Sequence, residues 1–119
     1  MTGIRLLGTL SLVFFAACAS TPKTQGEATV AHPGGARLRV VADGTATLRL
    51  MNTGPGTAVL REQYGEGTPV RSRNFTPGTR LLRRFDGEAV IRFLGVEGPP
   101  CRIVYEMEGN GSMALTDRP

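Results

Sequence analysis

This sequence contains no tryptophan, one histidine, one lysine and two cysteines among its 119 residues. Two cysteines exclude a disulfide-dense scaffold and a multi-cysteine zinc site. The single histidine, His32, has no second imidazole to join it in a metal site, and a Ser-His-Asp enzyme would depend on it alone. We therefore expect His32 to lie in a loop, and we expect a non-catalytic protein without a metal or cofactor.

Helical patterns are also missing. Glycine (16) and proline (8) are abundant, and no stretch of about ten residues places its apolar side chains at helical spacing. This composition favours many turns over long helices. Long apolar runs are equally scarce, because the one uncharged apolar run extends from Leu6 to Ala17, whereas a membrane-spanning helix needs about 20 residues.

The N-terminus has the order of segments found in secretory signals. A short start that contains Arg5 precedes the apolar run, and small residues follow it. Phe15-Ala16-Ala17-Cys18 resembles the lipobox of bacterial lipoproteins, with Phe15 where that family prefers leucine. The resemblance implies that Cys18 receives a diacylglycerol and becomes the first residue of the mature chain. Ala19, in place of the aspartate that retains such proteins in the inner membrane, favours the outer membrane.

The chain therefore divides into three parts. Residues 1–17 form the lipoprotein signal peptide, and residues 18–27 form the lipidated N-terminus and a flexible tether of small and polar residues. Residues 28–119 form a single β domain, because apolar and polar residues alternate there with a period of two. The alternating sets are centred on Val30, Leu38–Val40, Ala46–Leu50, Ala58–Leu60, Ala89–Phe93, Cys101–Met107 and Met113–Leu115.

Turn signals separate these sets. Asp43-Gly44, Asp86-Gly87 and Asn110-Gly111 predict two-residue hairpin turns, and broader turns are expected at Asn52–Gly56, Gly65–Gly67 and Pro77-Gly78. The strand length and spacing predict a small antiparallel β-sandwich of seven or eight strands, with a small β-barrel as the alternative. Leu48–Gly54 resembles the strand and Asn-x-Gly corner of bacterial immunoglobulin-like modules, which implies an immunoglobulin-like sandwich.

Arginine supplies thirteen of the 14 basic side chains, and the formal net charge is +4. The alternation places arginines on the polar faces of most strands, which suggests contact with an anionic lipid, an anionic glycan or an envelope protein. The candidate contact residues are Arg37, Arg39, Arg49, Arg71, Arg73 and Arg92. A solvated outer face is the alternative, because ten acidic residues, among them Glu62 and Glu66, dilute the positive field. An exported chain with few aromatic residues is not expected to bind nucleic acid.

Cys101 is the one cysteine of the mature domain, and it alternates onto the apolar face with Ile103 and Tyr105. We therefore expect a buried thiol, although an intermolecular disulfide would also be open to it.

These features favour a membrane-anchored, monomeric envelope lipoprotein that acts as a binding or structural module. The alternative is a periplasmic inhibitor or chaperone-like lipoprotein that binds another protein through the loop Gly65–Gly78. The sequence lacks the nucleophile, base or metal ligands that a hydrolase would need.

Overall fold

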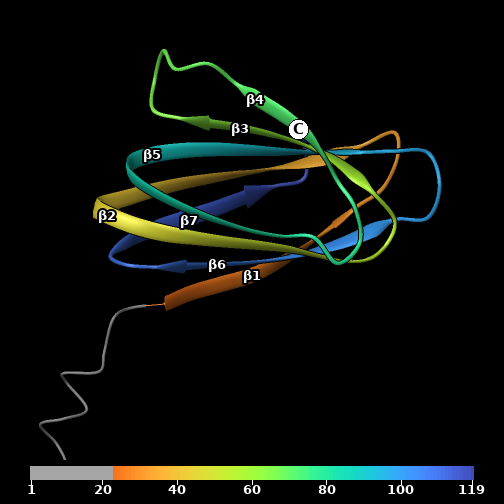
Figure 1. The fold of residues 1–119 in the computed structure, drawn as a ribbon, viewed down its shortest axis with the longest axis horizontal. Helices are drawn as coiled ribbons and strands as arrows, with labels where there is room; N and C mark the ends of the chain where they lie inside the picture. Colours follow the sequence, from red (N-terminus) through yellow and green to blue (C-terminus); the bar gives the residue numbers. More distant parts are fainter. Residues whose placement is uncertain (1–22) are drawn as a thin grey trace, which may run out of the picture.

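The structure is a computed structural model that describes residues 23–119, all of whose regular elements are β-strands (Figure 1). Cys18 and the predicted signal peptide, residues 1–17, lie outside the described residues. The strands are β1 (Lys23–Val30), β2 (Gly35–Pro55), β3 (Ala58–Tyr64), β4 (Arg71–Phe75), β5 (Arg80–Gly95), β6 (Cys101–Glu108) and β7 (Gly111–Thr116). The prediction of an all-β domain with seven or eight antiparallel strands is confirmed.

The strands form one antiparallel sheet that folds over to make two layers. Its order is β1-β6-β2-β5-β3-β4, with β7 also paired to β2. β2 and β5 are long enough to belong to both layers, and their middles bend where the pairing register shifts between Val41 and Thr45. One layer contains β7, the first arm of β2 (up to Val41), the second arm of β5 (from Glu88), β3 and β4. The other layer contains β1, β6, the second arm of β2 (from Thr45) and the first arm of β5 (up to Asp86). Because β1 and β4 end the order without closing on each other, the described sheet is an open sandwich and not a closed barrel.

The prediction of two-residue hairpin turns at the three Asx-Gly pairs is wrong, because none of these pairs connects two strands that pair with each other. Gly44 lies within β2 and Gly87 lies within β5, both at positive φ. Asn110-Gly111 joins β6 to β7, which pair with successive parts of β2 and not with each other. These bends lie at the same end of the molecule (Figure 1), where the Asp43 amide donates to the Asn110 carbonyl. A glycine at positive φ can make a bulge as readily as a tight turn, so the chain changes layer here without forming a hairpin.

The predicted tether is shorter than expected. Lys23–Glu27 belong to β1, and Lys23 lies opposite Glu108 at the start of a continuous antiparallel register with β6. An edge strand can be held by backbone hydrogen bonds while most of its side chains face solvent, so composition alone placed this segment outside the domain. Within the described residues the β domain therefore begins at Lys23, five residues after Cys18.

The core lies between the layers and is built from alternate residues of six strands. Its fully buried members include Leu38 and Leu48 of β2, Phe75 of β4, Phe93 of β5 and Met107 of β6. The period-two alternation therefore identified the buried face correctly along β2, the end of β5 and β6. Residues 23–119 contain a continuous hydrophobic core.

Asn52 holds the corner at the end of β2. Its side-chain amide donates to the carbonyls of Gly56 (2.9 Å) and Phe75 (2.8 Å), and its side-chain oxygen accepts from the Gly54 amide (2.7 Å). Asn52 is completely buried. The broad turn expected at Asn52–Gly56 is wrong for most of its length, because β2 runs to Pro55 with a register shift between Asn52 and Gly54. The Asn52 side chain joins this irregular end of β2 to the end of β4.

Candidate functional site: an arginine row on the outer sheet face

Three arginines lie side by side on the outer face of the layer that contains β3 and β4. Arg37 of β2 pairs directly with Arg92 of β5, which pairs on its other side with Arg61 of β3. Adjacent strands are about 4.8 Å apart, so the three backbones span about 10 Å. The row continues to a hydroxyl at each end, because Thr116 of β7 lies opposite Arg37 and Ser72 of β4 lies opposite Arg61.

No acidic residue occupies this five-strand row, which we call the arginine row (Thr116, Arg37, Arg92, Arg61 and Ser72). Among the described residues, none forms an ion pair with its three arginines. Arg37 and Arg61 are exposed and Arg92 is half-buried. Like charges placed directly opposite each other destabilise a sheet. The row therefore presents positive charge that the domain itself does not neutralise.

The sequence-based candidates separate into three groups. Arg37 and Arg92 belong to the row. Arg39 pairs with Glu88, and Arg49 lies 3.3 Å from Glu106 and 3.8 Å from Glu108, so acidic neighbours neutralise both. Arg71 and Arg73 flank the row residue Ser72 on the edge strand β4 but lie on the opposite face, because they pair with Glu62 and Leu60 on the inward face of β3. Arg61 was missing from the candidate set, although its alternation with Leu60 already placed it on the polar face.

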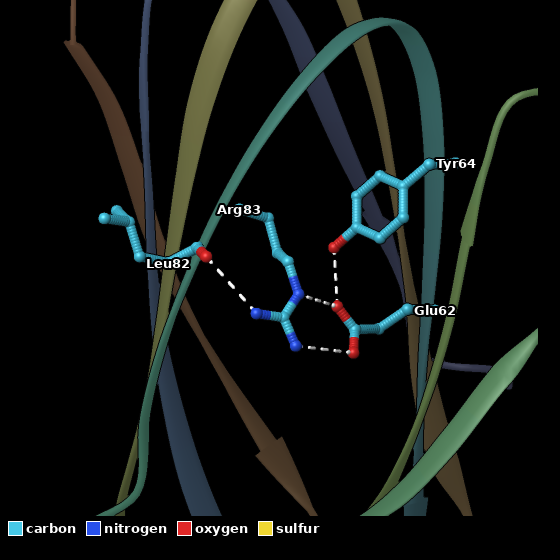
Figure 2. A network of polar contacts seen from close by, with 4 residues as sticks. All are labelled: Glu62, Tyr64, Leu82 and Arg83. Carbon is cyan, nitrogen blue, oxygen red and sulfur yellow. Dashed lines mark hydrogen bonds and ion pairs between the residues drawn. The ribbon is translucent and has the colours of Figure 1, made fainter.

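Glu62 was expected to be one of the solvated acids, and the structure shows that this is wrong. Glu62 is completely buried, because it continues the inward face of Ala58 and Leu60 on β3. Figure 2 shows its carboxylate between Arg83 and Tyr64. Arg83 donates from Nε to Oε1 at 2.8 Å and from Nη2 to Oε2 at 3.3 Å, and the Tyr64 hydroxyl donates to Oε1 at 2.6 Å.

The ionisation of this buried group follows from its neighbours. Burial by itself would raise the pKa of Glu62, but the hydrogen bonds from Arg83 and Tyr64 and the positive charge of Arg83 together lower it. Burial and the adjacent carboxylate raise the pKa of Tyr64, and the bond to Glu62 raises the pKa of Arg83. The group therefore holds Glu62 charged, Arg83 charged and Tyr64 neutral at neutral pH.

Cys101 is buried, with 1% of its surface exposed, which confirms the expectation of a buried thiol. Burial raises the pKa of this thiol, and raised pKa values reduce thiol reactivity. His32 is exposed in the connection between β1 and β2, as expected of a loop residue. Within residues 23–119, no cluster of three or more His, Cys, Asp or Glu side chains is arranged to hold a metal ion.

The stretch Gly65–Gly78, expected to be one exposed loop, contains β4 between two shorter connections. Thr68 fixes the first connection, because its hydroxyl lies 2.8 Å from the carbonyls of Tyr64 and Gly65.

In the part of the chain that the structure describes, no helix is long and apolar enough to cross a membrane. A scan against protein-family models and searches of curated proteins and of solved structures found no match to this chain.

Proposed function

We propose that this protein is a lipid-anchored module of the bacterial envelope whose arginine row binds the phosphate groups of anionic envelope lipids. The arginine row supports this proposal most directly. Arg37, Arg92 and Arg61 face outward on neighbouring strands without an acidic partner among the described residues. Guanidinium groups bind phosphate oxygens in bidentate fashion, so three of them on one face suit a surface rich in phosphate.

The surroundings of the row support a lipid partner. The next residues along the outer face include Val59, Val90 and Leu94, which are only partly buried. Charged guanidinium groups beside partly exposed apolar side chains match the boundary between lipid headgroups and acyl chains.

The short connection to the proposed lipid also supports this function. Five peptide steps separate Cys18 from Lys23, the first residue described in β1. At about 3.6 Å each they span at most about 18 Å, whatever their conformation. Acylation of Cys18 would therefore keep the domain within reach of the headgroups, where an arginine-rich face gains from the negative surface potential.

Lipid attachment is expected at Cys18 and nowhere else. Cells that express the chain and are fed labelled palmitate should incorporate the label into the wild-type protein, and Cys18→Ala should lose all of it. Cys101→Ala serves as the matched control and should keep full labelling, because Cys101 is buried in the domain core. An unlabelled wild type, or a labelled Cys18→Ala variant, would contradict the anchor.

The arginine row should account for binding to anionic membranes by a soluble chain that begins at Ala19. Replacing Arg37, Arg61 and Arg92 together by glutamine should weaken binding to phosphatidylglycerol vesicles at low salt about a hundredfold, since each basic residue near an anionic surface contributes about 1 kcal/mol. The salt dependence should flatten as well. Vesicle co-sedimentation over a range of salt concentrations measures both effects.

The control is a triple variant of equal charge in the other layer, with Arg49, Arg80 and Arg102 replaced by glutamine. Two of these arginines already have acidic partners, so this variant should bind more tightly than the row variant. The row variant should also keep or raise its melting temperature, because it loses repulsion between like charges. Equal binding by the two triple variants would show that net charge alone is responsible.

A further inference from the structure

We infer that a second basic site, separate from the arginine row, binds a single phosphate group in a cleft beside the first arm of β5. This cleft has a volume of about 400 Å³ and is lined by Tyr64, Thr68, Pro69, Arg71, Arg83 and Arg84. It brings together one continuous stretch, from the end of β3 at Tyr64 to the start of β4 at Arg71, and the later residues Arg83 and Arg84 of β5. Its volume suits a small ligand, whereas the arginine row is an open strip across five strands.

The charges of the cleft favour an anion. Three of its six lining residues are arginines and none is acidic. Glu62 is completely buried, lies opposite Arg71 in the β3–β4 register and forms its ion pair with Arg83. Arg71 and Arg84 are exposed and form no ion pair with any residue in the described range 23–119. Two arginines without an ion pair therefore remain, which match a phosphate monoester of about −1.5 to −2 charge better than a singly charged carboxylate.

Arg83 also has donors to spare. A guanidinium carries five N–H groups, and Arg83 uses three of them, on the two Glu62 oxygens and on the Leu82 carbonyl at 3.3 Å (Figure 2). Two N–H groups remain without an acceptor among the described residues. The side chain is 23% exposed, so it is accessible, and its pairing with Glu62 holds it in one orientation.

The other polar side chains of the cleft have no hydrogen-bond donor free for a ligand, because their hydroxyl groups already donate within the protein. The Thr68 hydroxyl donates to backbone carbonyls of its own turn, and the Tyr64 hydroxyl donates to Glu62. The arginines are thus the side-chain donors left for a ligand. A ligand rich in acceptor oxygens, as a phosphate monoester is, satisfies this arrangement best.

The wall of the cleft is fixed before any ligand binds. Besides the Thr68 hydroxyl bonds, the Gln63 side chain donates to the Thr68 carbonyl at 3.0 Å, and the Thr68 amide donates to the Gly65 carbonyl at 3.4 Å. The opposite wall is held by the Arg83 bonds to Glu62. A preorganised site loses less side-chain freedom on binding than a flexible one, so a small anion can be held by few contacts.

The test measures binding of inorganic phosphate and of glycerol 3-phosphate to the soluble chain beginning at Ala19, by calorimetry at fixed ionic strength. Arg71→Gln and Arg84→Gln should each weaken binding about tenfold or more. Arg80→Gln is the matched control, since it removes the same charge from the same strand and Arg80 does not line the cleft. It should bind phosphate as the wild type does.

Two further arms distinguish the source of the phosphate and the site that holds it. Recruitment to phosphatidic acid vesicles that is lost in Arg84→Gln would identify a lipid headgroup as the source, whereas tight binding of glycerol 3-phosphate without recruitment would identify a soluble phosphate monoester. The triple row variant should keep its affinity for inorganic phosphate even where vesicle binding fails. Absence of phosphate binding at millimolar concentration, equal losses in Arg80→Gln and Arg84→Gln, or loss confined to the row variant would overturn the inference.

Discussion

Replacing Arg83 by methionine should lower the free energy of unfolding by about 3–5 kcal/mol, the cost of leaving a buried charge without its partner. Glu62 is completely buried, and Arg83 supplies two of its three hydrogen bonds. Methionine keeps the apolar stem of the arginine while it removes the charge, so packing changes little. Chemical unfolding followed by circular dichroism measures this loss.

The contribution of Glu62 to the free energy of unfolding should change with pH in opposite directions in the wild type and in the Arg83→Met variant. The folded-state pKa of Glu62 is lowered in the wild type, so its pair contributes stability that is present above the ordinary glutamate pKa of about 4.3 and is lost as pH falls through the folded value. Without Arg83, burial should raise that pKa. The Arg83→Met variant should therefore be most deficient at neutral pH and recover towards the wild type as the solution becomes acidic.

A double variant isolates the charge from the packing. Combining Glu62→Gln with Arg83→Met removes both charges, and it should be more stable at neutral pH than Arg83→Met alone, because no uncompensated carboxylate is then buried. Its stability should also lack the Glu62-dependent change between neutral and acidic pH. If Arg83→Met cost less than about 1 kcal/mol at neutral pH, or if the double variant were the less stable of the two, the buried pair would not be what holds Glu62 in place.

The second large effect is expected at Asn52. Its side chain satisfies two carbonyls and one amide in the corner between β2 and β4, and none of its surface is exposed. Asn52→Ala leaves these two carbonyls and the amide without their hydrogen-bond partner. Each buried polar group left unsatisfied costs about 1–3 kcal/mol before the corner relaxes. We expect a loss of about 2–4 kcal/mol in the free energy of unfolding, measured by thermal and chemical unfolding.

Two variants show whether the hydrogen bonds carry this effect. Asn74→Ala on β4 changes an exposed asparagine and should stay within about 0.5 kcal/mol of the wild type. Asn52→Asp keeps the acceptor for the Gly54 amide but loses the donors to Gly56 and Phe75 and places a carboxylate against their carbonyls. It should be at least as destabilising as Asn52→Ala at neutral pH. A stable Asn52→Asp variant would show that the two carbonyls do not need the amide donor.

Much of the fold follows from local pattern. Alternation along Leu38–Val40, Ala46–Leu50 and Cys101–Met107 identified strands and their buried faces, because successive side chains of a strand point to opposite faces. The same logic placed Cys101 in the core. It also contained an unused signal at Glu62, which shares the phase of Ala58 and Leu60; a carboxylate in that phase suggests a buried ion pair.

Local pattern could not decide which strands are neighbours. Asp43-Gly44 and Asp86-Gly87 carry the residues of hairpin turns, yet the arms on either side of each pair lie in different layers. Glycine permits the positive φ of both a turn and a bend, and the choice depends on where the long arms of β2 and β5 find hydrogen-bonding partners. The start of β1 at Lys23 has the same cause, since β6 supplies its partners.

Local sequence pattern was enough to predict an all-β domain, the inward-facing residues of most strands and the arginines on its polar faces, whereas the choice of an open sandwich over a closed barrel required the strand order. Which arginines remain without an acidic partner became clear from the pairing of the strands. The tertiary structure placed Arg39 and Arg49 beside glutamates, Arg37 beside Arg92, and Arg83 against Glu62. The physical reason is that a period of two fixes the face of a residue within its own strand, whereas its cross-strand neighbours depend on the register of strands far apart in the chain.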